Sequence, residues 1–131
     1  MFAVDSADPT PIYAQLDRAI RAAIAAGQLV AGERLPTVRQ LAVNLRVNAN
    51  TVAKVYTELE RSGVLATQRG VGTFVRPAAE HPAARQSARD KEKALRLLSD
   101  RLLAEAYAIG LTIDEVIRHL ESRRTNSKES K

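Results

Sequence analysis

The sequence predicts a mainly α-helical chain that contains one small β-hairpin. Apolar residues recur at steps of three and four in five segments, which is the periodicity of helices with one buried face. After the third of these segments, two short runs rich in β-forming residues flank the glycines of "RGVG", which favour a tight reversal. With 131 residues, the chain is long enough for one compact domain and an additional helical region.

The three N-terminal helical segments begin at recognisable capping residues. Thr10 and Pro11 predict the start of the first helix, because Thr caps helices and Pro suits the first helical position. Thr37 and Gln40 have the spacing of a capping box and predict the start of the second. The third begins near Asn48, so only about two residues separate it from the second. This spacing predicts a sharp turn between the two helices.

The hairpin is predicted to follow the third helix directly, with strands over 64–68 and 73–76. Gly70 and Gly72 lie between the two strands, where a tight reversal needs positive φ angles. An Ala- and Pro-rich stretch comes next and is interpreted as a linker. The predicted organisation is flexible residues 1–9, a domain at 10–76, a linker at 77–87, a two-helix region at 88–122 and a flexible tail at 123–131.

The two C-terminal helices each carry an apolar stripe that a pair of helices alone cannot bury well. The stripes could pack back onto the N-terminal domain, or they could pair with a second copy of the chain. We expect the second arrangement, a homodimer. The expected dimerisation residues are Leu95, Leu98, Leu102, Ala106, Ile109, Ile113, Val116, Ile117 and Leu120.

Charge and composition restrict the class of protein. The net charge is +5, and residues 10–76 hold nine Lys and Arg against four Asp and Glu, which favours a polyanionic partner. The absence of Cys excludes disulfides, Cys-based zinc sites and a thiol nucleophile, and the two His lie far apart, so neither a metal nor a cofactor is expected. No apolar run is long enough to span a membrane and no secretory signal is indicated, so a cytoplasmic location is expected.

The order of a helix, a helix–tight turn–helix pair and a glycine-tipped hairpin is the layout of a winged helix-turn-helix domain. In such a domain the second helix of the pair enters the major groove of DNA, and the hairpin, or wing, meets the backbone or minor groove beside it. From their own chemistry, Asn50 can pair with adenine, and Lys54 can bind guanine or a phosphate. Thr37 can offer its hydroxyl and its backbone N–H to a phosphate.

The stretch 31–75 resembles the DNA-binding domain of the GntR family of bacterial transcription regulators. The resemblance is carried by "LPTVRQLA", "NTVAKVYTELERSGVL" and "GVGTFV", in this order, and extends back through "PIYAQL" to about Thr10. The short two-helix tail resembles the YtrA-type subfamily. The resemblance implies a non-enzymatic regulator, usually a repressor, that binds a palindromic operator in double-stranded DNA as a homodimer.

The resemblance adds DNA-binding residues to those expected from chemistry. Arg39 matches the family's arginine that reaches the DNA, and Asn48 and Thr51 match positions that contact the backbone or base edges. The full expected set is Thr37, Arg39, Asn48, Asn50, Thr51, Lys54, Arg69, Gly70 and Gly72. Two departures stand out: Ala49 and Ala53 replace arginines of many relatives, and Arg46 stands where the tight turn often holds Gly. Arg46 must therefore adopt a costlier backbone geometry, or the turn must differ.

Several alternatives stay open at the level of the sequence. Asn50 and Thr51 can simply satisfy backbone N–H groups at the start of a helix. Arg69 can read bases or merely add charge. Tyr13 and Tyr56 are expected to pack against other residues of the protein and not to stack on bases. A winged helix can also serve as a protein-interaction module, although Arg39 argues against an acidic or neutral recognition face. A nucleotide-using enzyme would need a Lys-Ser/Thr pair after the glycines, which is not present.

The sequence does not identify a small-molecule effector. About 55 residues after the wing leave little room for a deep pocket. A ligand could still bind between the tail helices and the DNA-binding domain, or at the dimer interface.

Overall fold

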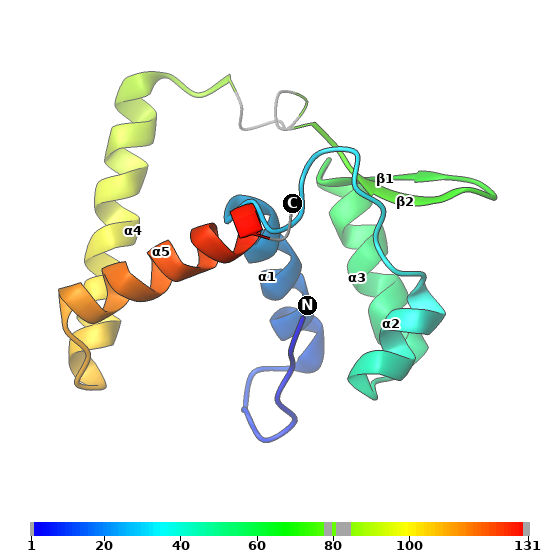
Figure 1. Cartoon of the computed structure of the whole chain (residues 1–131), viewed down its shortest axis with the longest axis horizontal. Coiled ribbons are helices and arrows are strands. Elements are labelled where there is room, and N and C mark those ends of the chain that lie inside the picture. The colour runs from blue at the N-terminus through cyan, green and yellow to red at the C-terminus, as the bar shows by residue number, and fades with distance from the viewer. Residues whose placement is uncertain (1, 78–79, 81–84, 130–131) are drawn as a thin grey trace. The chain divides into compact units, whose positions relative to one another are not determined.

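The computed structural model describes residues 2–77, 80 and 85–129, with side chains described up to residue 124. The chain divides into two compact units, Met1–Pro82 and Ala83–Lys131, so the boundary falls within the predicted linker. Residues 78–79 and 81–84 of that linker lie outside the described residues. The elements are α1 (Ile12–Ala25), α2 (Val38–Leu45), α3 (Ala49–Arg61), β1 (Leu65–Gln68), β2 (Gly72–Val75), α4 (Ala88–Ala108) and α5 (Ile113–Glu129), as drawn in Figure 1.

The first unit is built around the apolar faces of α1, α2 and α3. The buried face that apolar periodicity predicts for the third helical segment is confirmed in α3, where Val52, Val55 and Leu59 are fully buried. Two residues of the hairpin, Leu65 and Val75, close the core from the side of the strands. The buried cluster comprises Leu16, Ile20, Ala23, Leu29, Leu35, Leu41, Ala42, Val52, Val55, Tyr56, Leu59, Val64, Leu65 and Val75. This core gives the first unit its own source of stability.

The hairpin pairs β1 and β2 in antiparallel register, with Leu65 opposite Val75 and Gln68 opposite Gly72. The predicted reversal is confirmed, since a three-residue loop joins the strands and Gly70 has a φ of 77°. Because the amide of Val71 donates to the carbonyl of Gln68, the tip is a closed turn.

The segment between α1 and α2, expected to be a simple connector, forms a third extended piece of the wing. Leu35 donates its amide to Thr73 at 2.8 Å, and Val75 donates to Glu33 at 3.0 Å. Arg34 thereby lies opposite Phe74 in an isolated bridge. The pairing is not evident in the sequence because the segment is very short and ends at a proline. The wing is therefore hydrogen-bonded to the chain that enters α2.

The N-terminal segment is packed, which differs from the flexible residues 1–9 expected from the sequence. Phe2 and Val4 lie partly buried against the core, where their apolar side chains leave water. The side chain of Gln15 links this segment to α1, because its Oε1 accepts from Asp5 at 2.7 Å and its Nε2 donates to the carbonyl of Thr10 at 2.7 Å. The expected helix cap at Thr10 is not formed, since α1 starts at Ile12 without a side-chain cap.

The second unit consists of α4 and α5. At the start of α5, Thr112 and Glu115 exchange hydrogen bonds in a capping box. The helix α5 continues to Glu129, well beyond the end at residue 122 expected from the sequence. Among the described hydrophobic side chains of this unit, Ala106 is the one classed as buried, at 5% exposure. The unit therefore has almost no core of its own.

Candidate nucleic-acid interface

The turn between α2 and α3 depends on the backbone of Arg46. This residue has φ 58° and ψ 45°, the left-handed conformation, and is the one non-glycine residue with positive φ among the described residues. Of the two alternatives that the sequence leaves open, the structure therefore shows the costlier geometry. The turn is closed by the amide of Val47, which donates to the carbonyl of Ala42 at 3.0 Å. This reversal sets the direction in which α3 leaves α2.

The helix α3 presents a polar side opposite its buried face. Its predicted N-cap is confirmed, because Oδ1 of Asn48 accepts a hydrogen bond from the amide of Asn50 at 2.7 Å. The side chains of Asn48, Asn50 and Lys54 are exposed, whereas Thr51 is half-buried. The amide-bearing and cationic side chains expected to meet base edges are thus accessible at the start of α3.

The start of α2 is held by the predicted capping box. The Oγ1 of Thr37 accepts from the amide of Gln40 at 3.1 Å, and Oε1 of Gln40 accepts from the amide of Thr37 at 2.9 Å. The backbone N–H of Thr37 therefore donates to Gln40 in this structure, and its donation to a phosphate stays a prediction. Its hydroxyl proton stays available as a donor. Arg39 follows two residues later with an exposed side chain.

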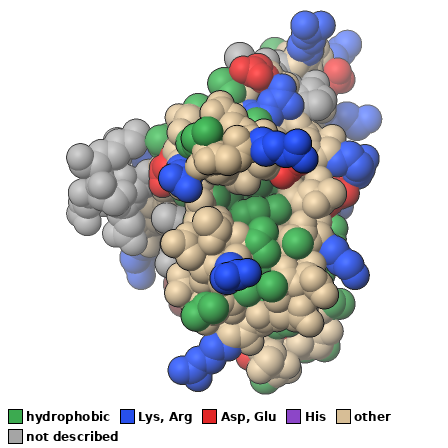
Figure 2. Space-filling view, turned by 90° about the vertical axis from the view of Figure 1, so that its right-hand side faces the viewer, with side chains coloured by type: hydrophobic (Ala, Val, Ile, Leu, Met, Phe, Trp, Pro, Cys, Tyr) green, Lys and Arg blue, Asp and Glu red, His purple; other side chains and the backbone are tan. Residues whose placement is uncertain are grey.

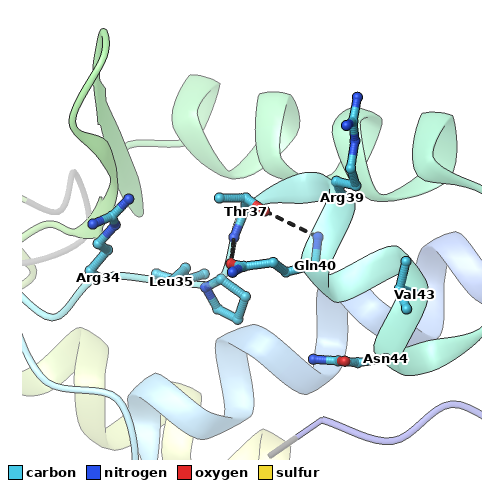
Figure 3. A pocket seen from close by; sticks show the side chains of 8 residues that line it. Arg34, Leu35, Thr37, Arg39, Gln40, Val43 and Asn44 are labelled. Carbon is cyan, nitrogen blue, oxygen red and sulfur yellow. Dashed lines mark hydrogen bonds between the residues drawn. The ribbon is translucent and has the colours of Figure 1, made fainter.

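A depression of about 860 Å³ lies in front of α2. Its lining includes Arg34, in the segment before α2, and Arg39, in α2 itself. Figure 3 shows Arg34 at the base of the hairpin and Arg39 on α2, with Thr37 between them. Both arginine side chains extend toward the side on which the hairpin and α3 lie. The lining residues are Arg34, Leu35, Pro36, Thr37, Arg39, Gln40, Val43 and Asn44.

Arg34 is not among the residues expected from the sequence to bind DNA. Its side chain crosses the wing at Gly72, where an added Cβ would lie 2.6 Å from the Nε of Arg34. The sequence signal for a basic site here is that Arg34 and Arg39 flank "LPTV". Nothing in the local sequence marks the connector as part of the wing.

The tip of the wing is exposed. Arg69 and Gly70 are both accessible, and Val71 has 51% of its surface exposed. Gly72 is half-buried, and its φ of 149° is one that side chains with a Cβ rarely adopt. The bare backbone of the tip can therefore approach a nucleic-acid strand closely, with Arg69 beside it.

The two tyrosines differ from each other. Tyr56 packs as expected: it is buried, and its hydroxyl donates to the carbonyl of Pro36 at 2.6 Å. Burial raises the pKa of Tyr56 to about 12. Tyr13 is 38% exposed and lines a second depression with Asn50 and Lys54 of α3, so it belongs to the accessible side.

Three further properties of the described residues concern surface charge, membrane spans and metal-binding groups. Figure 2 shows one face of the molecule, on which basic side chains outnumber acidic ones. In the described part of the chain, no helix is both long and apolar enough to span a membrane. Among the same residues, no group of three or more His, Cys, Asp or Glu side chains is placed to hold a metal ion.

The expected dimerisation residues lie on the second unit, and most are accessible. Leu95, Leu98, Leu102, Ile109, Ile113, Ile117 and Leu120 are exposed by 43–74%, Val116 is half-buried and Ala106 is buried. The expected apolar stripes therefore exist, largely uncovered.

A winged helix-turn-helix domain followed by a helical unit is an architecture that DNA-binding transcription regulators use. Comparison with known proteins gives the family. Residues 12–75 match the bacterial regulatory proteins of the gntR family. The chain is 32% identical to the uncharacterised HTH-type transcriptional regulator YhcF of Bacillus subtilis over 86% of this chain and 88% of that protein.

Two further relatives agree with this match. The HTH-type transcriptional repressor YtrA of Bacillus subtilis is 41% identical over 57% of this chain and 58% of that protein. The structure of YtrA from Sulfolobus acidocaldarius, a GntR-family transcription factor, superposes with a TM-score of 0.55 at 33% identity, covering 79% of this chain and 97% of that one. The chain belongs to the GntR family, whose members are transcriptional regulators and not enzymes.

Proposed function

We propose that this regulator is a repressor that binds a palindromic operator as a homodimer, with α3 in the major groove and the wing at the backbone or minor groove. The observation that carries the proposal is the accessible polar start of α3. Asn50 and Lys54 lie there on one exposed side, as base-reading side chains require.

Exposed cations around α3 support contact with the DNA backbone. Among the described residues, Lys54, Arg39 and Arg69 form none of the ion pairs found in the structure, which join Arg21 to Asp17, Arg61 to Glu58 and Arg76 to Glu80. A cation without a carboxylate partner is available to a phosphate. Thr37, Asn48, Thr51, Gly70 and Gly72 complete the proposed contact set.

The apolar surface of the second unit supports the proposed homodimer. A pair of helices with one buried hydrophobic side chain lacks the burial that stabilises independent folding. A twin surface on a second copy would cover the exposed leucines and isoleucines of both chains at once. A twofold dimer also suits two half-sites about one DNA turn apart. The name of the YtrA repressor supports the repressor role by analogy alone.

Binding to DNA from upstream of the protein's own gene tests the operator. Fluorescence anisotropy over a salt series should show binding that weakens steeply with salt and keeps its preference over unrelated DNA. Equal affinity for operator and unrelated DNA at every salt concentration would contradict a sequence-specific regulator. A reporter fused to the same upstream DNA separates repression from activation, since repression requires a higher signal when the protein is deleted.

Sedimentation tests the dimer. The full chain should sediment as a dimer, and a chain ending at Arg76 should stay folded as a monomer, because the core of the first unit lies within residues 16–75. If the shortened chain also sediments as a dimer, the assignment of dimerisation to α4 and α5 is wrong.

A further inference from the structure

We propose that Arg34 is an additional contact to the DNA backbone, held against the wing at Gly72 and acting together with Arg39 on phosphates in front of α2. The inference rests on the proposed function as a DNA-binding regulator. It adds a residue outside the contact set expected from the sequence, and it gives Gly72 a second role.

The side chain of Arg34 lies against the backbone of the wing. An added Cβ at Gly72 would lie 2.6 Å from the Nε of Arg34 and 3.3 Å from its Cδ and Cζ. A Cβ at Gly72 would therefore displace the end of the arginine side chain, and its absence lets the arginine stem lie across the strand. The main chain of Arg34 is paired to the wing as well, through its bridge to Phe74.

The charge around Arg34 suits an anion. The depression in front of α2 is lined by two arginines and by no Asp or Glu. Arg34 takes part in none of the ion pairs among the described residues. Its neighbour Glu33 is engaged elsewhere, because its Oε1 accepts a hydrogen bond from the amide of Val30 at 3.1 Å. The guanidinium of Arg34 is therefore exposed without a carboxylate partner.

The position of the depression indicates a nucleic-acid phosphate as the anion. It extends from the wing, at Arg34, to the start of α2, at Arg39, with the Thr37 hydroxyl between them (Figure 3). A DNA strand that passes from the groove occupied by α3 to the wing would run along this line. A guanidinium presents a planar fork that matches phosphate oxygens, so two of them can hold successive phosphates.

The test compares Arg34→Ala, Arg34→Lys and a matched control, Arg18→Ala, which removes an exposed arginine of α1. Anisotropy of the full chain is measured on operator and unrelated duplexes across a salt series, after circular dichroism has shown that each variant is folded. Arg34→Ala should weaken binding to both duplexes by about tenfold. It should also reduce the slope of log K against log salt by about 0.9 for each phosphate that is no longer neutralised. Arg34→Lys should keep the slope, because the charge is retained.

The outcomes separate the inference from the function on which it rests. If the unaltered protein binds no DNA, the proposed function fails. If the unaltered protein binds its operator and Arg34→Ala matches Arg18→Ala in affinity and slope, the inference about Arg34 is overturned. Inorganic phosphate at matched ionic strength provides a further arm. It should displace DNA more readily from the unaltered protein than from Arg34→Ala, because the ion competes with a backbone phosphate for the same guanidinium. Phosphate that binds at Arg34 and leaves DNA binding unchanged would mean that the assignment to the DNA backbone is wrong.

A double-mutant cycle tests the contact between the Arg34 side chain and Gly72. Gly72→Ala should weaken DNA binding, since its Cβ displaces the arginine side chain. In a chain that already carries Arg34→Ala, the same substitution should have a smaller effect, because no guanidinium is left to displace. An equal fold-change in both backgrounds would show that Gly72 does not act through Arg34.

Discussion

The backbone of Arg46 leads to the most direct test of the structure. An L-residue in the left-handed conformation loses roughly 1–2 kcal/mol relative to a right-handed one, because its Cβ approaches the following carbonyl oxygen. With φ 58° and ψ 45°, Arg46 bears this cost at the turn between α2 and α3. Glycine has no Cβ and avoids it, but it loses about 0.5–1 kcal/mol more backbone entropy on folding.

Two substitutions isolate the effect of the Cβ. Arg46→Gly and Arg46→Ala both remove the charge, which at the end of α2 can itself contribute about 0.3–1 kcal/mol. They differ in the Cβ alone. The glycine variant should therefore be more stable than the alanine variant by about 0.5–1 kcal/mol, the difference between the two contributions above.

Urea unfolding at fixed protein concentration measures this difference. The midpoint should be higher for Arg46→Gly than for Arg46→Ala, with the same denaturant slope, and the melting temperatures should differ by about 2–8 °C for a unit of this size. Arg46→Asn should fall between them, because Asn tolerates the left-handed conformation better than Ala. Equal stability of the glycine and alanine variants would refute the left-handed turn at Arg46.

Three further predictions concern alkaline stability, DNA binding and assembly. The pKa of Tyr56 is raised above that of an unfolded tyrosine, so its contribution is complete below pH 10 and is lost as the pH rises toward 12; Tyr56→Phe should flatten this loss in urea titrations and cost about 1 kcal/mol at neutral pH. An unchanged alkaline profile in the variant would contradict the assignment to Tyr56. Arg39→Ala should lower operator affinity by about 1–3 kcal/mol in anisotropy, and unchanged affinity would show that α2 does not face the DNA. Leu102→Ala should raise the dimer dissociation constant about 30-fold by sedimentation, since covering its 43% exposed surface contributes roughly 1 kcal/mol per chain; Asp100→Ala on the opposite side of α4 is the control, and equal effects would contradict the apolar interface.

Local patterns predicted the helices and hairpin of the first unit well, because each depends on neighbouring residues. The capping box at Thr37 and the N-cap at Asn48 form as expected, and the stripe from Val52 to Leu59 is buried. The wing's third extended piece was missed, since Arg34 pairs with Phe74 forty residues later and such pairing leaves no local periodicity. The packed N-terminal segment was missed for the same reason, as Phe2 and Val4 meet a core assembled from distant residues.

The candidate site likewise has some features that the sequence predicts and others that it does not. The exposure of Asn50 and Lys54 follows from helical periodicity around a buried stripe, which the sequence carries in full. The role of Gly72 does not, because a glycine in a hairpin is explained locally by its φ angle alone. Its proximity to the Nε of Arg34 becomes visible when the two segments are brought together.

The sequence by itself determined the family, the order of the elements and the accessible side of α3, since these depend on spacing and side-chain chemistry along the chain. Tertiary structure decided which of two turns Arg46 adopts, that the segment before α2 pairs with β2, and that an arginine of this connector lies on the wing. The physical reason is that backbone conformation at a turn and contacts between distant segments are set by the packing of the whole core. The residues in a short window of sequence do not specify them.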